Sequence, residues 1–172
     1  NPHFWGKLRR SQTKILSLVS TPKGIVNKEM LLGEYKHSVD QKGRLAIPAK
    51  FRPRLSSGAI ITRGLDRSLF LFDLTEWETL AKKLMALPLA QADSRAFVRL
   101  MLSGASNVEI DSQGRILIPD TLRAYASLEK SAVVTGLYNR IEIWSEEVWK
   151  VYKANTENKS DEIAEKLGEL GI

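Results

Sequence analysis

Alternating apolar and polar residues mark two short strands near the start of the patterned sequence. Tyr35, His37 and Val39 alternate with polar residues, which predicts a strand with one buried face. Asp40–Gly43 has the composition of a turn, because Asp can accept from the backbone two residues on and Gly tolerates positive φ. Arg44–Ile47 predicts a returning strand, which the following proline ends.

The next segments predict two more strands and two helical elements. Ala49–Leu55 suits a short helical turn, interrupted by a proline. Ala59–Thr62 and Leu69–Phe72 are apolar strands on either side of a turn. Asp73 is a good N-cap for the helix that follows, which carries Trp77 on its apolar face.

This pattern occurs twice in the chain. Asp40–Pro48 matches Asp111–Pro119, and Arg52 matches Arg123, at an offset of 71 residues. The second copy continues in the same way, with Ser145 as its N-cap. Four short strands alone would expose their edges, whereas two interleaved copies close into a barrel. We therefore expect a β-rich α+β fold in which two pseudo-symmetric repeats share one core, with flanking helices.

The pattern predicts five segments. They are an N-terminal extension over residues 1–33, a first repeat over 34–81, a helical connector over 82–104, a second repeat over 105–153 and an acidic tail over 154–172. Residues 1–29 lack sustained periodicity, so we expect a non-native or flexible extension, with organised sequence beginning after Met30. A helix is expected from Ala90 to Leu102.

Composition excludes several classes of protein. The 172 residues contain no cysteine, which excludes a disulfide scaffold, a thiolate metal site and cysteine catalysis. Two histidines, His3 and His37, are too few for a His-rich metal cluster. No apolar run approaches the roughly 18 residues that span a bilayer. We expect a cytoplasmic protein with no metal, cofactor or membrane partner.

Positive charge is concentrated in two segments. Residues 1–29 and 34–67 each carry a net charge of +5, whereas residues 141–172 carry −4. A lysine or arginine group is usually a solvated surface. Confinement of the whole excess to two segments favours a polyanionic partner.

Enzyme interpretations are weak. Asp40 and Asp111 could form a carboxylate pair, but each begins an Asp-x-x-Gly turn, where it caps the turn and pairs with the Arg four residues on. His37 and Ser38 are neighbours on opposite faces of one strand, so they cannot assemble into a triad with Asp40. The sequence has no Gly-rich phosphate loop and no metal-ligand spacing. We expect no enzymatic activity and no small-molecule substrate.

A basic hairpin suits DNA better. Alternation sends Tyr35, His37, Val39, Leu45 and Ile47 inward and Lys36, Ser38, Arg44 and Ala46 outward. A two-stranded ribbon fits the major groove, where Arg or Lys can bridge guanine O6 and N7. The expected contacts to double-stranded DNA are Lys36, Gln41, Lys42, Arg44, Lys50, Arg52 and Arg54.

The two repeats differ in charge. The second repeat has Gln113, Thr121 and Tyr125 where the first has lysine or arginine, although it keeps Arg115. We therefore expect the first repeat to face DNA. Arg115, with few cations around it, is expected to pair with Asp111 and to matter more for stability.

The doubled Asp-x-x-Gly-Arg-[Leu/Ile]-x-Ile-Pro motif, followed by an apolar strand and a Trp helix, resembles the MraZ family. This family comprises bacterial transcriptional regulators built from two AbrB-like (SpoVT-AbrB) modules. The resemblance covers the chain from Leu32 to about residue 155. By position, the motif residues are Asp40, Gly43, Arg44, Asp111, Gly114 and Arg115.

The resemblance implies a double-split β-barrel and a homo-oligomeric ring. It also implies binding to repeated G-rich boxes upstream of the protein's own gene, control of a cluster of division and cell-wall genes, and a place at the nucleoid. We also expect oligomerisation from the exposed apolar load on Leu69–Phe72, Ile141–Trp144 and the Trp helices, which one small barrel cannot cover on all sides. Two alternatives remain open: a ring-forming structural protein with a non-DNA partner, and an antitoxin-like partner protein.

Overall fold

The computed structural model describes residues 30–168 and residue 171, and the expectation for residues 1–29 lies outside them. The strands are β1 (Leu31–Ser38), β2 (Arg44–Ala46), β3 (Ala59–Arg63), β4 (Leu69–Asp73), β5 (Ser106–Val108), β6 (Arg115–Leu117), β7 (Ser131–Tyr138) and β8 (Ile141–Ser145). The helices are the 3-10 helix η1 (Ala49–Leu55), α2 (Leu74–Met85), α3 (Ala92–Ser103), α4 (Asp120–Tyr125), α5 (Glu146–Glu157) and α6 (Ser160–Gly168).

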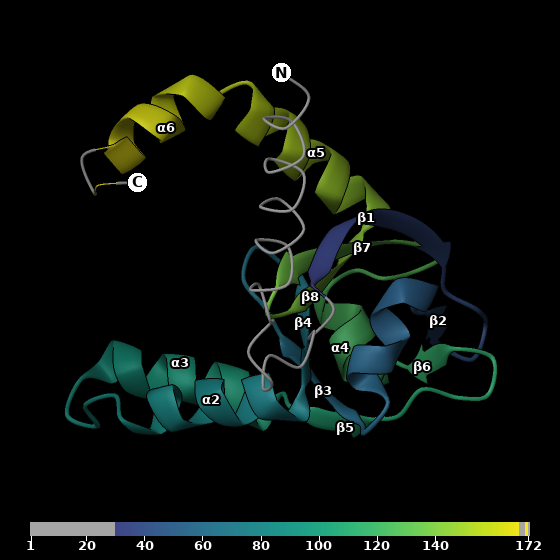
Figure 1. Cartoon of the computed structure of the whole chain (residues 1–172). Coiled ribbons are helices and arrows are strands. Elements are labelled where there is room, and N and C mark those ends of the chain that lie inside the picture. Colours follow the sequence, from purple (N-terminus) through teal and green to yellow (C-terminus); the bar gives the residue numbers. More distant parts are fainter. Residues whose placement is uncertain (1–29, 169–170, 172) are drawn as a thin grey trace, which may run out of the picture.

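The two repeats interleave. The larger sheet has the strand order β1-β7-β8-β4-β3-β5, and β2 pairs separately with β6 (Figure 1). If each strand is replaced by its equivalent in the other repeat, the same order is obtained, read from the opposite end of the sheet. The sheet therefore has an internal pseudo-twofold axis between β8 and β4. The expected sharing of one fold by both repeats is confirmed.

The expected hairpin between the first two strands is wrong. β1 pairs along its whole length with β7 of the other repeat, from Leu31 opposite Tyr138 to Ser38 opposite Ser131. β2 pairs with β6, and a bridge between Val39 and Leu45 links it to the end of β1. The exchange gives β1 an eight-residue ladder, whereas pairing with the three-residue β2 would leave most of its backbone groups unpaired.

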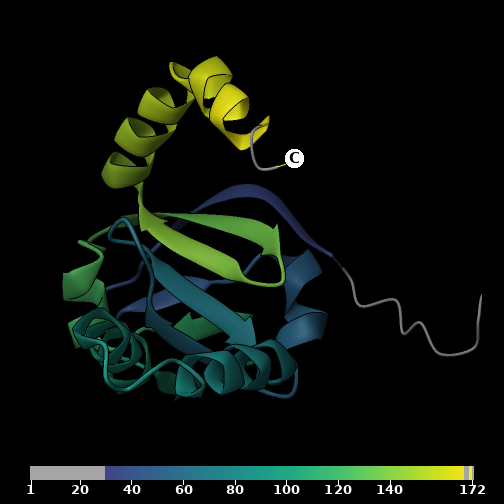
Figure 2. The same cartoon turned by 90° about the vertical axis from the view of Figure 1, so that its left-hand side faces the viewer.

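The larger sheet is antiparallel and open. β1 and β5 stand at the two ends of its order and are not paired with each other, so a closed barrel is not seen among the described residues. Figure 2, seen from the side of α3 and α6, shows α2 and α3 below the sheet and α5 and α6 above it. The helix expected over residues 90–102 is α3, and the expected helical turn after β2 is η1.

One hydrophobic core draws on both repeats. It includes Leu45, Ile47, Phe51, Ile61 and Leu71 from the first repeat and Ile116, Ile118, Leu122, Val134 and Ile143 from the second. The strands expected to drive oligomerisation belong to it: Leu69 and Ile141 are completely buried within one chain. The expectation that these strands expose an apolar load is therefore wrong, because strand exchange and the flanking helices already cover them.

The two Trp helices attach to the sheet in parallel ways. The carboxylate of Asp73 caps α2 by accepting from the Glu76 amide at 2.9 Å. Ser145 precedes α5 without a side-chain cap bond. In each repeat the helix Trp packs on an aromatic residue of the last strand: Trp77 on Phe72 at 6.0 Å and Trp149 on Trp144 at 5.2 Å between ring centroids.

Candidate nucleic-acid interface

β2 and β6 form a short antiparallel ribbon on the side of the molecule away from α3 and α6 (Figure 1). We call this pair the β2–β6 ribbon. Its register places Arg44 opposite Leu117 and Ala46 opposite Arg115. Leu45 and Ile116, between them, are buried in the core. Because side chains alternate along a strand, both arginines lie on the outward face of the ribbon.

An Asp-x-x-Gly turn leads into each strand of the β2–β6 ribbon. In the first turn, Oδ1 of Asp40 accepts from the amides of Lys42 and Arg44, each at 2.9 Å, and Gly43 has φ of +79°. In the second turn, Asp111 accepts from the corresponding amides at the same distance, and its glycine has φ of +78°. The turn chemistry predicted from the sequence is confirmed in both repeats.

Each turn is also bonded to the other repeat. The Gly43 carbonyl accepts from the Ile118 amide at 3.0 Å, and the Gly114 carbonyl accepts from the Ile47 amide at 2.9 Å. These bonds extend the three-residue ladder at both of its ends, so one turn lies at each end of the β2–β6 ribbon. The candidate interface is therefore one unit made by both repeats and not the hairpin of a single repeat.

Both motif arginines pair with the aspartate of their own turn. Nε of Arg44 lies 2.7 Å from Oδ2 of Asp40. Arg115 is held more extensively: its Nε and Nη2 lie 2.9 and 2.8 Å from Oδ2 of Asp111, and its Nη1 lies 3.7 Å from Asp40. The pairing expected of Arg115 is thus present at both positions. Arg44 nevertheless keeps a more exposed side chain, at 32% against 23%.

These contacts lower the pKa of both aspartates. For Asp40 the largest cause is the hydrogen bond from the Arg44 amide, and the Arg44 guanidinium adds to it. For Asp111 the same two groups of Arg115 lower the pKa in the same order. Both carboxylates therefore stay ionised near neutral pH, and each can hold its arginine in a fixed direction.

The other predicted DNA contacts separate into two groups. Gln41 and Lys42 are exposed on the first turn, next to Arg44. Arg52 lies against the second turn and donates from Nε to the Ile47 carbonyl at 2.8 Å. These residues belong to the candidate interface because they lie on or against its two turns.

Two predicted lysines make contacts outside the β2–β6 ribbon. Nζ of Lys36 lies 2.5 Å from a carboxylate oxygen of Glu146, at the start of α5. The exposed Lys50 places its ammonium 4.9 Å from the ring centroid of Tyr35. The structure therefore does not bring Lys36 to the turns, and Lys50 lies on an aromatic residue of β1.

Arg54 is the clearest departure from the sequence-based expectation. Its side chain is only 6% exposed, and its Nε donates to Oδ2 of Asp73 at 2.8 Å. It also pairs with Glu76 and donates to the Tyr138 carbonyl at 2.7 Å. Arg54 thus joins η1, the start of α2 and the end of β7, and its charge is neutralised away from the ribbon.

Sequence reasoning missed Arg123. It lies on α4 against the first turn, as Arg52 lies on η1 against the second. The signal was present, because the internal repeat aligns Arg52 with Arg123. Only the interleaving of the two repeats shows that each arginine contacts the turn of the other repeat.

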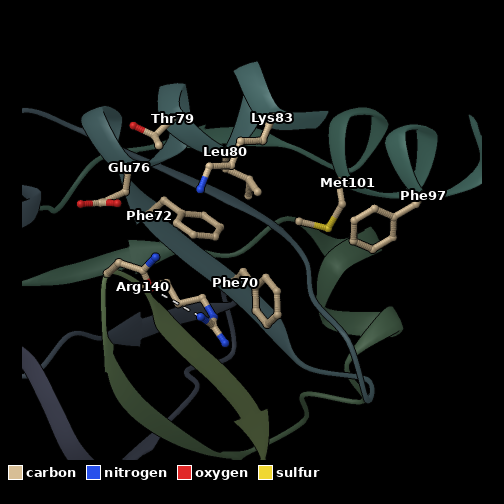
Figure 3. A pocket seen from close by; sticks show the side chains of 10 residues that line it. Phe70, Phe72, Glu76, Thr79, Leu80, Lys83, Phe97, Met101 and Arg140 are labelled. Carbon is tan, nitrogen blue, oxygen red and sulfur yellow. Dashed lines mark hydrogen bonds between the residues drawn. The ribbon is translucent and has the colours of Figure 1, made fainter. Parts of the chain in front are cut away.

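A separate cavity of about 170 Å³ lies between β4, α2 and α3 (Figure 3). Phe70, Phe72, Phe97 and Met101 give it a largely apolar lining. The guanidinium of Arg140, at its rim, lies 4.9 Å from the Phe70 ring and is paired with Glu142 of β8. The polar side chains of Glu76, Thr79, Lys83 and Asn139 also line the cavity.

In residues 30–168 and 171, no helix is long and apolar enough to cross a bilayer.

Comparison with known proteins finds the same family model in both repeats. A family model described as "MraZ protein, putative antitoxin-like" matches residues 30–100 and again residues 101–169. The "Transcriptional regulator MraZ" of Thermoanaerobacter pseudethanolicus is 51% identical over 143 residues, which cover 83% of this chain and 100% of the relative. That of Limosilactobacillus reuteri is 56% identical over 138 residues, covering 80% and 97%. That of Pelotomaculum thermopropionicum is 50% identical over 143 residues, covering 83% and 99%.

Proposed function

Because this chain belongs to the MraZ family, we propose that it is a sequence-specific DNA-binding regulator of transcription without catalytic activity. It acts as a repressor at repeated G-rich boxes upstream of its own gene and of a cluster of division and cell-wall genes. The observation that carries this proposal is the outward face of the β2–β6 ribbon, which presents two aspartate-oriented arginines beside an exposed lysine.

The ribbon has the right shape for direct base recognition. A two-stranded ribbon fits the major groove of B-DNA, which is about 12 Å wide. Guanine presents two acceptors there, O6 and N7, which a guanidinium can contact together. Nε of Arg44 donates to Asp40, and within the described residues its Nη1 and Nη2 donate no hydrogen bond. Those two groups are the donors that a guanine contact needs, so Arg44 reads a guanine of each box.

The remaining cations set the position of the ribbon on the duplex. Lys42 is exposed on the first turn and contacts the phosphate backbone. Arg115, held by two carboxylates, contributes less to base recognition than Arg44. The first repeat therefore carries most of the sequence reading and the second repeat completes the ribbon.

A homo-oligomeric ring lets several ribbons bind repeated boxes at once. Apolar side chains outside the core support self-association: Met85, Leu89, Tyr138 and Val151 are each more than 60% exposed. A heterologous contact between such surfaces closes into a ring when its rotation permits. Light scattering at micromolar protein tests this part of the proposal, and a monodisperse monomer would contradict it.

Salt-titrated binding to the DNA upstream of the protein's own gene tests DNA recognition. We expect tight binding to this DNA and much weaker binding to a scrambled duplex of equal composition. Each phosphate contact adds about −0.9 to the slope of log K against log salt concentration. Lys42→Ala should reduce the magnitude of this slope by about 0.9 for each engaged protomer.

Lys166→Ala is the matched control, because Lys166 is an exposed lysine on α6 and pairs with Glu162. It should leave affinity and slope unchanged. Equal binding to the scrambled duplex would contradict sequence-specific recognition and favour a partner other than DNA, including an antitoxin-like role.

A further inference from the structure

Each repeat places an arginine against the glycine of the other repeat's turn. A β-carbon added at Gly43 would stand 2.7 Å from Nε and 2.8 Å from Cζ of Arg123. A β-carbon added at Gly114 would stand 2.2 Å from Cζ of Arg52. Real β-carbons do not approach other atoms this closely, so the space that a side chain would fill at each turn is occupied by a guanidinium.

The two arginines are not equally satisfied. Nε of Arg52 donates to the Ile47 carbonyl at 2.8 Å. Nε of Arg123 is buried and has no hydrogen-bond partner within the described residues. Its Nη2 pairs with Asp120, whose side chain is 91% exposed. A buried donor without a partner destabilises the fold, and an ion pair with so exposed a partner adds little folding stability.

The polar contacts of the Arg123 guanidinium therefore contribute little to folding stability. Its planar guanidinium packs against Gly43 of the first repeat. The carbonyl of Gly43 also accepts from the amide of Ile118, which belongs to the second repeat like Arg123. Gly43 connects Lys42 to Arg44, the two side chains of the first turn proposed to contact DNA. The orientation of these side chains thus depends on the second repeat, although the cations belong to the first.

We propose that Arg123 is a positioning residue for DNA recognition: it fixes the Asp40–Gly43 turn, and through it Arg44, in the orientation that reads the operator. This inference rests on the proposed DNA-binding function. In this proposal Arg123 makes no contact with DNA: its Nε is buried and its Nη2 pairs with Asp120. The second repeat, which has fewer cations, thereby sets the specificity of the first.

The test compares Arg123→Met and Arg123→Lys with wild type in DNA binding and thermal melting. Both variants remove the planar guanidinium, and Lys keeps the charge. We expect a melting temperature equal to or above that of wild type. We expect specific affinity to fall about tenfold in both variants, within the range that contacting neighbours show. The salt slope should stay that of wild type.

A lower slope magnitude in Arg123→Met but not in Arg123→Lys would identify a direct phosphate contact and overturn the proposal. Loss of binding in proportion to lost thermal stability would also overturn it, as would wild-type affinity in both variants. Lys166→Met is the matched control for removing a cation, and it should change none of these quantities.

The crossed geometry gives a second, sharper measurement. Lys42 and Gln113 occupy equivalent positions in the two turns. In double-mutant cycles, Arg123→Met should be coupled to Lys42→Ala and additive with Gln113→Ala. The reverse result would overturn the assignment to the first turn.

A readout without DNA separates this inference from the proposed function. In the free protein, Arg123→Met should shift the NMR amide resonance of Gly43 and leave that of Gly114 in place. An unshifted Gly43 resonance would overturn the positioning role. Failure of wild type to distinguish its upstream DNA from the scrambled duplex would instead contradict the proposed function.

Discussion

Nε of Arg54 lies 2.8 Å from the carboxylate of Asp73, and both side chains are less than a tenth exposed. The same carboxylate caps α2 through the Glu76 amide. A charge this deeply buried is stable only with its partner, because desolvation penalises either ion alone. The pair therefore ties η1, which follows the β2–β6 ribbon, to the helix that closes the first repeat.

Arg54→Ala should destabilise the protein by about 3–5 kcal/mol, since it leaves a buried carboxylate without its charge partner. Urea unfolding measures this change. Lys82→Ala is the control: Lys82 also pairs with a residue of α2, Glu78, but both side chains are more than two thirds exposed. It should cost at most about 1 kcal/mol. A salt slope of DNA binding that changes in folded Arg54→Ala would show that Arg54 contacts phosphate after all.

Arg44→Ala should abolish specific DNA binding, because one guanine-reading arginine carries about 1–3 kcal/mol of discrimination at each site. Arg115→Ala should weaken binding less and lower stability more, since Arg115 contacts both turn carboxylates. Both variants should stay folded, because each pair lies at the surface with about a quarter to a third of its side chains open to solvent, and surface ion pairs contribute about 1 kcal/mol at most.

Salt-titrated binding measures the effect of each arginine variant on DNA recognition, and thermal melts measure its effect on stability. If Arg115→Ala abolishes specific binding and Arg44→Ala does not, the base-reading arginine has been assigned to the wrong repeat.

The local chemistry of this chain could be predicted from its sequence, and its strand partners could not. The Asp-x-x-Gly turns, the helix cap at Asp73 and the inward alternation of Leu45 and Ile47 depend on neighbours within a few residues. Pairing of β1 with β7 depends on which of two similar repeats supplies the longer partner, and no local signal states that choice.

The same limit explains the outcome for the candidate site. A cluster of Lys and Arg predicts a basic surface, but it does not distinguish the buried Arg54 from the exposed Lys42, twelve residues earlier in the sequence. Arg123 lies about 80 residues from Gly43 in the sequence and contacts it only because the repeats exchange strands. Repeat alignment identified the equivalent residues, whereas contacts across the repeats required the fold.

Gly114→Ala should destabilise the protein by about 1–3 kcal/mol, because the backbone there has φ of +78° and the new β-carbon would meet Arg52. Gly168→Ala is the matched control: within the described part of the chain, nothing lies within 4 Å of its β-carbon position, at the end of α6. It should be neutral or stabilise by up to about 1 kcal/mol. Chemical denaturation compares the two, and equal effects would show that the second turn is not constrained by Arg52.

Stability should also fall as pH drops below about 6.5, because of His37. Burial lowers the pKa of this half-buried imidazole, and the nearby Arg52 charge lowers it further. The unfolded chain, with the ordinary pKa of 6.5, therefore takes up its proton first as the pH falls. The free energy of unfolding decreases from there down to the folded-state pKa of His37 and then becomes level, since both states are then protonated. Well above pH 6.5 neither state carries this proton, and the contribution is constant.

Urea unfolding between pH 5 and 8, in a His3→Gln background that leaves His37 as the single histidine, isolates this effect. His37→Gln should remove the pH dependence between about 6.5 and the folded-state pKa, because the amide does not titrate. Arg52→Gln should weaken it but not abolish it, since burial, the larger cause, remains. A pH dependence that survives His37→Gln unchanged would assign it to other groups. If it disappears in Arg52→Gln, then the arginine charge and not burial sets the pKa of His37.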